Sequence, residues 1–446
     1  MGKPVAGGPG ILTDSMITVV DTVRPHHAKR TPLMAHLPDV TRQSTLAHRT
    51  RREPPAGEPS RNARLLERAG YVGKLMAGVY SYLPLGLRVL RNVEGIIREE
   101  MNSVGGQEVL MPALHPLANW ETTGRQDMDI LFRTKSGSAD AVLGPTHEEV
   151  VTPLLATQVA SYKDLPASVF QIQNKFRNEA RPKSGLLRGR EFGMKDMYSF
   201  HLSEADLEEY YERVAEAYRC VFERCGLGAV THYTYASGGA FSEFSHEFQA
   251  VTPYGEDTIY LDHGKGIALN KEIIDRYPAD EIAAMEQVTA IEVGNIFKLG
   301  TRFADAFGFR LPDASGVPQS IHMGCYGIGT TRLVGAIAEI LSTDDAMVWP
   351  ENVAPYHCHV VPMDAGRLEL AESAAQALAA AGHSVLLDDR AVRAGAKLAD
   401  ADLIGLPHRV VIGARTAAEG LVEYTNRVSG RTVKVPVAEL AAATAA

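Results

Sequence analysis

Cysteine, tryptophan and long apolar runs are scarce in this chain of 446 residues. Its four cysteines (Cys220, Cys225, Cys325 and Cys358) are scattered, without the paired spacing of a zinc site or a disulfide framework, so we expect reduced thiols. No apolar run is long enough to span a membrane, and the N-terminus lacks the compact apolar core of a signal peptide. These absences predict a cytoplasmic protein that does not associate with a membrane.

An excess of positive charge is also missing. The chain has 45 Lys and Arg against 54 Asp and Glu, a formal net charge of −9. This balance argues against a protein that coats nucleic acid non-specifically, although a local basic patch can still bind RNA. The length and a hydrophobic content of 45% predict two or three domains with a sizeable core.

The pattern along the chain divides it into three parts. Residues 1–41 are rich in Gly, Pro, His and Arg, and we expect a largely disordered extension in which Met34 is an alternative start. Residues 42–350 form the main domain. Residues 351–446 alternate short apolar strands with helical segments at 368–381 and 395–404, which predicts a small parallel-sheet domain. We expect the hinge between these domains at 349–355.

The most informative stretch runs from Phe170 to Phe200. Apolar and polar residues alternate up to Glu179, a basic loop containing Gly and Pro follows, and a second strand begins near Phe192. Several cations surround this one turn, and guanidinium groups match phosphate oxygens in pairs. The stretch therefore predicts a hairpin that grips a nucleoside triphosphate over a sheet. Taken alone, a surface hairpin with solvated charges is the alternative.

Two further segments have a recognisable form. Apolar residues at helical spacing predict a helix over 87–101, followed by a strand at 108–112 that ends in proline. Near the end of the main domain, Gly327-Ile-Gly329-Thr-Thr-Arg332 lacks the third glycine of a dinucleotide fingerprint. Its glycines allow close approach of a ligand, and Arg332 stands in the first turn of a helix, where phosphate is favoured.

Together these segments resemble the three motifs of the class II aminoacyl-tRNA synthetases. The strings FRNEARPKSGLLRGREFGMKDMYSF and GCYGIG are similar to the bacterial prolyl-tRNA synthetases. The resemblance implies an α+β fold, with a class II catalytic domain at 42–350, in which helices flank an antiparallel sheet, and an α/β anticodon-binding domain at 351–446. It also implies a homodimer through the helix–strand unit of motif 1, which is the weakest of the three signatures.

The resemblance implies how ATP is bound at motif 2. Arg177 holds the α-phosphate and the amino-acid carboxylate, and Glu179 meets the adenine amino group. Arg188 reaches the γ-phosphate, and Phe192 stacks on adenine. These four roles follow from the family and not from the spacing of the residues.

Motif 3 and a neighbouring strand imply the remaining contacts to ATP. Gly327 and Gly329 let the backbone approach the nucleotide, and Arg332 covers adenine and contacts the γ-phosphate. Glu292, in the family-like string IEVGNIF, is a candidate ligand for Mg²⁺, because hard carboxylate oxygens bind that ion beside phosphates. An ordinary strand carboxylate is the alternative for Glu292.

The string Gly-Pro-Thr146-His-Glu148-Glu149 is a substrate loop in the family, where Thr146 and Glu148 would bind the secondary amine of proline. Val151 stands where a metalloprotease helix would need its second histidine. Thr146 as a helix N-cap is the plain alternative. The similarity of SHEFQ to the family's pocket segment makes His246 and Phe200 further proline-binding candidates, with a buried structural histidine as the alternative. The preceding string GGAFSEF departs from the family pattern.

Two features concern tRNA. Fewer than forty residues separate Tyr260 from Glu292, too few for the editing insertion that typical bacterial enzymes carry. A proline pocket rejects the smaller alanine only through lost apolar contact, roughly 1–3 kcal/mol, so we expect modest discrimination. In the C-terminal domain, Arg390, Arg393 and Lys397 are candidates for anticodon binding, with solvated helix charges as the alternative.

The expected activity is therefore that of a prolyl-tRNA synthetase. It would use ATP and Mg²⁺ to convert L-proline to prolyl-adenylate and transfer it to tRNA(Pro), with Arg177, Arg188 and Arg332 as the catalytic cations. One alternative is an enzyme that loads an amino acid on a carrier other than tRNA. The other is a non-catalytic paralogue that only binds tRNA.

Overall fold

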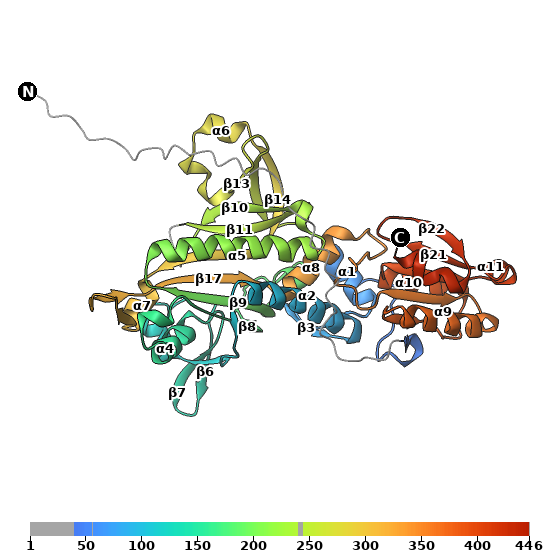
Figure 1. Cartoon of the computed structure of the whole chain (residues 1–446), viewed down its shortest axis with the longest axis horizontal. Helices are drawn as coiled ribbons and strands as arrows, with labels where there is room; N and C mark the ends of the chain where they lie inside the picture. The colour runs from blue at the N-terminus through green and yellow to red at the C-terminus, as the bar shows by residue number, and fades with distance from the viewer. Residues whose placement is uncertain (1–39, 56, 240–243, 446) are drawn as a thin grey trace, which may run out of the picture. The chain divides into compact units, whose positions relative to one another are not determined.

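A nine-stranded sheet forms the centre of the larger domain in the computed structural model, which describes residues 40–55, 57–239 and 244–445 (Figure 1). Its strands are β4 (Gln107–Glu108), β8 (Ala167–Phe176), β9 (Glu191–His201), β17 (His322–Ile328), β14 (Glu286–Gly300), β11 (Phe244–Val251), β10 (Thr231–Ser237), β13 (Ile267–Asn270) and β12 (Asp257–Asp262). All pairings are antiparallel except β4–β8 and β10–β13. The expected antiparallel sheet is confirmed.

Helices pack against one face of this sheet. They are α5 (Glu204–Arg224), α2 (Pro84–Ser103), α8 (Thr330–Leu341) and α1 (Arg61–Arg68). Helix α5 begins where Ser203 Oγ accepts the amide of Asp206, and its Tyr211 and Tyr218 are buried against the sheet. Figure 1 shows α5 lying along the strands, on the side away from α4 and α7. The apolar contacts on this face form the largest core cluster.

The opposite face of the sheet carries a row of polar positions. The register aligns Gln171, Asp196, Gly327, Asn295 and Glu247 across five neighbouring strands. Smaller elements cover part of this face: α3 (Leu117–Thr122), α4 (Glu148–Gln158), α7 (Arg302–Ala306), β5 (Leu114–Pro116), β6 (Phe132–Ser136) and β7 (Ala139–Leu143). Because side chains alternate along a strand, this row determines which residues can reach a site.

The C-terminal residues build a second sheet. Strands β18 (Cys358–Pro362), β19 (Val385–Leu387) and β20 (His408–Ile412) are parallel, and β21 (Val422–Asn426) and β22 (Thr432–Val435) extend them antiparallel. Helices α9 (Leu368–Ala380), α10 (Ala394–Ile404), α11 (Ala414–Ala418) and α12 (Leu440–Thr444) complete the unit. The βαβαβ alternation predicted from the sequence is present.

The N-terminal part of the described chain differs from the prediction. Strand β1 (Val40–Arg42) pairs parallel with β19, so these residues belong to the C-terminal sheet and not to a disordered extension or the catalytic domain. Gln43 continues this attachment, since its Oε1 lies 2.9 Å from Nε2 of the buried His359. A three-residue strand gives too little periodicity to be predicted. The rest of the expected extension, including Met34, lies outside the described residues.

The segment expected to be a hinge is packed instead. Trp349 and Val353 are buried, and the Trp349 amide donates to Gly405 O at 3.1 Å. Tyr71 Oη donates to Ile404 O at 2.6 Å, and the Tyr71 ring lies 5.3 Å from the Trp349 ring. These contacts tie α10 to the segment that follows α1. The boundary at 350 therefore marks a change of sheet and not a free linker.

Motif 1 is present with a shorter strand than expected. Helix α2 contains the predicted 87–101, but β4 (Gln107–Glu108) includes only Glu108 of the strand expected at 108–112. Val109 adds one bond to Phe170 O, and Leu110 is 77% exposed. The remaining elements are β2 (Val72–Met76), β3 (Val79–Tyr82), α6 (Ala279–Ala283), β15 (Arg310–Pro312) and β16 (Pro318–Ser320).

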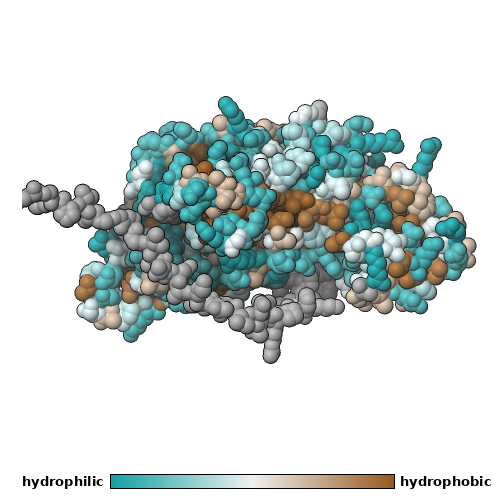
Figure 2. All heavy atoms as spheres, turned by 90° about the horizontal axis from the view of Figure 1, so that it is seen from above, coloured by the Kyte–Doolittle hydropathy of each residue, from teal (hydrophilic) through white to brown (hydrophobic). Residues whose placement is uncertain are grey.

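Polar side chains dominate the face that Figure 2 shows, with a patch of hydrophobic side chains near its middle. Among the described residues, no helix is long and apolar enough to cross a membrane.

Candidate active site

A cavity of about 260 Å³ opens on the polar face of the central sheet, next to the motif 2 hairpin. Its walls come from motif 2, motif 3, and the strands β12 and β14. The lining residues are Arg177, Glu179, Leu186, Leu187, Arg188, Gly189, Phe192, Glu256, Asp257, Ile291, Glu292 and Arg332. The structure thus brings together six of the residues predicted to bind ATP or Mg²⁺.

Arg177 follows the end of β8 and lies over the ring of Phe192, 5.3 Å from its centroid. Its Nη2 donates to Pro145 O at 3.4 Å. Burial, with the nearby Arg332 cation, lowers the pKa of Arg177. An arginine remains a cation in proteins, so the lowered pKa indicates positive charge without a full counter-charge, a setting in which a phosphate or carboxylate binds well.

Glu179 and Arg188 form an ion pair with each other. Arg188 Nε lies 2.9 Å from Glu179 Oε2, and Arg188 Nη1 donates to Glu256 Oε2 at 2.9 Å. Lys183 Nζ lies 3.4 Å from the other oxygen of Glu256. Both predicted ligands of ATP therefore line the cavity, but each is engaged by a protein partner in this structure.

Arg332 stands in the first turn of α8, after the strand-to-helix junction that the sequence predicts. Its Nη1 donates to both the main-chain oxygen and Oε2 of Glu292 at 3.0 Å, and its Nε donates to Leu187 O. On the polar face, a methyl group added at Gly327 would meet no protein atom closer than 3.9 Å. The space above Gly327 is thus available to a ligand, while Gly329 directly precedes α8.

Carboxylates gather beside the cavity. Gln249 Nε2 bridges Glu247 Oε2 at 2.8 Å and Asp257 Oδ2 at 2.9 Å. Burial and the neighbouring Glu292 raise the pKa of Glu247 to about 8 and also raise that of Asp257. Hard oxygens at Asp257 and Glu292 fit Mg²⁺ bound together with phosphate oxygens. Among the described residues, no three metal-ligating side chains are placed to hold a metal ion by themselves.

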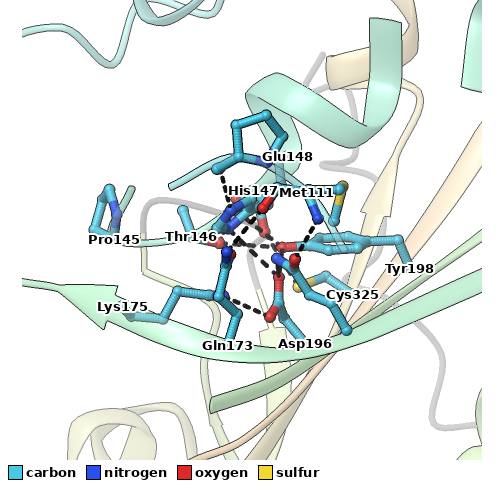
Figure 3. Close-up of polar contacts among 12 residues, drawn as sticks. Met111, Pro145, Thr146, His147, Glu148, Gln173, Lys175, Asp196, Tyr198 and Cys325 are labelled. Atoms are coloured by element: carbon cyan, nitrogen blue, oxygen red, sulfur yellow. Dashed lines mark hydrogen bonds and ion pairs between the residues drawn. The ribbon is translucent and has the colours of Figure 1, made fainter. Parts of the chain in front are cut away.

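The substrate loop predicted from Thr146 and Glu148 adjoins this cavity through Pro145. Thr146 Oγ1 donates to Glu148 Oε2 at 2.7 Å, and Cys325 Sγ donates to Glu148 Oε1 at 3.2 Å (Figure 3). Helix α4 begins at Glu148 with His147 as its N-cap, so the alternative reading of Thr146 as a cap is wrong. Its hydroxyl instead orients a buried carboxylate.

Arg125 and Cys325 are site residues that were not predicted from the sequence. Arg125 Nη1 lies 3.2 Å from Glu148 Oε2 and 3.0 Å from Glu149 Oε1, and all three side chains are almost fully buried. Burial lowers the pKa of Arg125, but the two carboxylates more than compensate and raise it. The sequence signal that could have indicated Arg125 was the pair of adjacent glutamates at the start of a buried helix, because two buried carboxylates require a nearby cation. For Cys325, the string GCYGIG gave no indication that the side chain would contact a site residue.

Asp196 connects the sheet to the substrate loop. Its Oδ2 accepts from Tyr198 Oη and Gln171 Nε2, each at 3.0 Å, and its Oδ1 lies 2.7 Å from Lys175 Nζ. The same Tyr198 oxygen accepts the amide of His147 at 3.0 Å (Figure 3). Burial raises the pKa of Asp196, but the Lys175 ammonium and the hydrogen bonds from Lys175 and Gln171 together lower it below its usual range. Lys175, expected on an open face of the hairpin, is fully buried.

The other two proline-binding candidates, His246 and Phe200, lie on opposite faces of the sheet. His246 is on the helix-covered face, where its Nδ1 lies 2.8 Å from Tyr211 Oη and its ring stacks on Tyr233. Strand alternation instead turns its neighbour Glu247 to the polar face, so the pocket role for His246 is wrong and the structural alternative holds. Phe200 is fully buried in an apolar cluster, with its ring 5.9 Å from that of Phe309. Residues 240–243 of the string GGAFSEF, which departs from the family pattern, lie outside the described residues.

The three anticodon-binding candidates have different surroundings. Arg390 forms ion pairs with Asp388 and Asp400, each at 2.8 Å. Lys397 is buried and donates to Asp388 O at 2.9 Å, so it stabilises the loop after β19 and is not placed to contact RNA. Arg393, directly before α10, is exposed and has no ion pair among the described residues. A charge count along the sequence could not separate these three.

Comparison with known proteins agrees with this architecture. Residues 132–341 match the tRNA synthetase class II core domain (G, H, P, S and T), and residues 357–445 match an anticodon binding domain. The proline–tRNA ligase of Zymomonas mobilis is 40% identical over 419 residues, covering 86% of this chain and 94% of that protein. The proline–tRNA ligase of Geobacillus thermodenitrificans is 34% identical over 552 residues, covering 88% and 97%.

Solved structures show the same fold. The prolyl-tRNA synthetase from Cryptosporidium parvum complexed with halofuginone and AMPPNP superposes with a TM-score of 0.71 at 18% identity, over 86% of this chain and 73% of that one. The same enzyme complexed with L-proline and AMP gives a TM-score of 0.69 at 17% identity, over 86% and 76%.

Proposed function

The chain belongs to the prolyl-tRNA synthetase family of class II aminoacyl-tRNA synthetases, and on this premise we propose that it activates L-proline with ATP and transfers it to tRNA(Pro). The observation that carries the proposal is the position of Arg177. Its guanidinium group lies over Phe192 in the nucleotide cavity and also contacts Pro145 of the substrate loop. One cation therefore stands where an amino-acid carboxylate and a phosphate must meet.

Proline is held at both of its charged groups. Its cationic amine pairs with Glu148, whose carboxylate is oriented by Thr146 and Cys325. Its carboxylate points toward Arg177. Because Glu148 is fully buried, this contact excludes water and gains strength from the low local dielectric.

ATP occupies the adjoining cavity. Adenine stacks on Phe192, and the terminal phosphates lie between Arg188 and Arg332. For this, the ion pair of Glu179 with Arg188 opens, which frees the carboxylate for the adenine amino group and the guanidinium group for phosphate. Mg²⁺ would be held by Glu292 with Asp257 and would supply positive charge to the phosphates.

The chemistry is an in-line displacement. A carboxylate oxygen of proline attacks the α-phosphorus, the bond to the bridging oxygen breaks, and pyrophosphate leaves with prolyl-adenylate remaining. Arg177, Arg188 and Arg332 stabilise the charge that develops, so catalysis depends on positioning and electrostatics and not on a covalent nucleophile. The 3′-terminal ribose hydroxyl of tRNA(Pro) then attacks the prolyl carbonyl, and AMP leaves.

We propose that the active form is a cytoplasmic homodimer joined through motif 1. Strand β4 is the last strand of its sheet, so its outer edge lacks a partner strand within the described chain. Leu75, Met76 and Leu110 are exposed large apolar residues on β2 and just beyond β4, which suits an interface. Sedimentation of Leu110→Asp against wild type tests this, and an unchanged dimer would contradict it.

A compact form without an editing insertion is also proposed. The alignment with the Geobacillus relative spans 552 residues, more than this chain contains, so that protein has a long segment that the chain lacks. Between β13 and β14 the chain has only a short 3₁₀ helix and α6. Discrimination against alanine then depends on the pocket alone, about 1–3 kcal/mol.

ATP–pyrophosphate exchange with proline, alanine and cysteine, followed by charging of tRNA(Pro), tests the function. We expect exchange with proline, weaker exchange with alanine, and charging. Exchange without charging would favour a different carrier, and no exchange with any amino acid would favour a tRNA-binding paralogue.

A further inference from the structure

The amine end of the proposed proline site contains two buried carboxylates and one buried cation that contacts both. In the described part of the chain, Arg125 is the cation that contacts both Glu148 and Glu149, at 3.2 and 3.0 Å. The side chains of Arg125, Glu148 and Glu149 are 2%, 0% and 0% exposed, so solvent does not screen their charges from one another. With both carboxylates ionised, the cluster would carry one uncompensated negative charge in a region of low dielectric, which is costly.

The two oxygens of Glu149 differ in their surroundings. Oε1 accepts hydrogen bonds from Thr123 Oγ1 at 2.8 Å and from Arg125 Nη1 at 3.0 Å. Oε2 is buried and meets no hydrogen-bond donor among the described residues. An ionised carboxylate oxygen without a donor is strongly disfavoured, whereas a protonated one removes the excess charge.

Among the described residues, Arg125 is the cation that acts on Glu149, and the other titratable groups nearby supply no second one. Burial lowers the pKa of His115 to about 4 and that of His147 to about 3, so both imidazoles are neutral near pH 7. Burial raises the pKa of Cys325, which keeps its thiol protonated. The ammonium of Lys175 is committed to Asp196 at 2.7 Å.

We propose that Glu149 holds a proton while the amino-acid site is empty and releases it to solvent when the cationic amine of the amino acid binds beside Glu148. This inference rests on the proposed function. The amine stays protonated, so the complex exchanges one proton on Glu149 for one ligand cation. Arg125 is a positioning residue that links the two carboxylates and keeps both within reach of the same charge.

The electrostatics supply the coupling. Burial, and then repulsion by Glu148, raise the pKa of Glu149 to about 7. A cation beside Glu148 offsets that repulsion, and the pKa of Glu149 falls. The affinity for proline should then increase as pH rises toward about 7. The increase is up to about tenfold per pH unit where binding releases one full proton from Glu149.

Calorimetric titration of the full-length protein with L-proline tests this directly. The observed enthalpy is compared at pH 7 in phosphate and in Tris, whose ionisation enthalpies differ strongly. We expect a fraction of a proton released near pH 7, rising toward one at lower pH while binding remains measurable. Equal enthalpies in the two buffers would overturn the inference without using any variant.

Two variants sharpen the assignment. Glu149→Gln should bind proline more weakly than wild type above pH 7, with no proton release and a KM for proline that no longer falls as pH rises. Thr123→Val removes a hydrogen bond that lowers the pKa of Glu149, so the fall in KM should move to higher pH. The KM for ATP should keep its pH profile in both variants, because neither Thr123 nor Glu149 lines the nucleotide cavity. A wild-type profile in Glu149→Gln would overturn the inference.

The outcomes separate this inference from the proposed function. If proline neither binds nor supports pyrophosphate exchange at any pH, the proposed function fails. If proline supports exchange but releases no proton, only the coupling fails.

Discussion

The thiol of Cys325 donates to Glu148 Oε1 across 3.2 Å, which joins motif 3 to the substrate loop at the carboxylate assigned to proline. A strand of the nucleotide motif thus orients the amino-acid ligand. Burial and the negative charge of Glu148 raise the pKa of this thiol, so it is a donor and a poor nucleophile at neutral pH.

Replacing Cys325 should therefore affect proline more than ATP. Cys325→Ala removes one hydrogen bond from a weak thiol donor to a carboxylate, about 0.5–1.5 kcal/mol, which raises the KM for proline about two- to tenfold with the KM for ATP unchanged. Pyrophosphate exchange measures both constants. Cys325→Ser keeps a donor and is the matched control, and an unchanged proline KM in the alanine variant would contradict the contact.

Glu247 should make stability fall with rising pH. Its folded pKa of about 8 lies above the ordinary glutamate value of 4.5, so the folded state binds the proton more tightly and loses stability as pH rises between those two values. Glu247→Gln should unfold at a higher denaturant concentration than wild type at pH 8.5, with a smaller difference at pH 5. Identical pH profiles would show that Glu247 titrates normally.

His246 should matter for stability and not for proline. His246→Ala loses the hydrogen bond with Tyr211 and the stacking on Tyr233, so we expect a lower Tm and a destabilisation of about 1–3 kcal/mol. The KM for proline should stay within about twofold. A large increase in that KM with an unchanged Tm would restore the pocket role that the sequence suggested.

Alanine variants of Lys397 and Arg393 make a matched comparison in the C-terminal domain. Lys397→Ala should destabilise the protein by about 1–3 kcal/mol, because it removes a buried donor beside Asp388. Arg393→Ala should leave Tm unchanged and lower kcat/KM for tRNA(Pro) about fivefold, the value of one hydrogen bond to phosphate. If Arg393→Ala charges tRNA normally, its assignment to the RNA interface is wrong.

The sequence predicted what depends on local pattern. Helix α2, the motif 2 hairpin and the strand-to-helix junction before Arg332 all follow from periodicity, glycine and proline. The side of the sheet to which a residue turns was not predictable for β11, because a resemblance identifies the string SHEFQ but not its register. His246 was therefore assigned to the pocket in place of Glu247.

Long-range pairing was the other obstacle. Arg125 meets Glu148 and Glu149 only because the loop after α3 folds against α4, and no spacing rule connects them. The attachment of β1 to β19 likewise joins residues at opposite ends of the chain. Buried partners such as Lys175 with Asp196 resemble solvated charges in a sequence, since burial is a property of the fold.

The most direct test of the account is ATP–pyrophosphate exchange with L-proline in Arg177→Ala. Arg177 lines the nucleotide cavity and also contacts the substrate loop, so its loss should reduce exchange about 100-fold or more, as when a charge-stabilising donor is removed from an active site. Lys135→Ala, an exposed ion-pair variant in the β6–β7 hairpin, should exchange normally. Near-wild-type exchange in Arg177→Ala would contradict the proposed site.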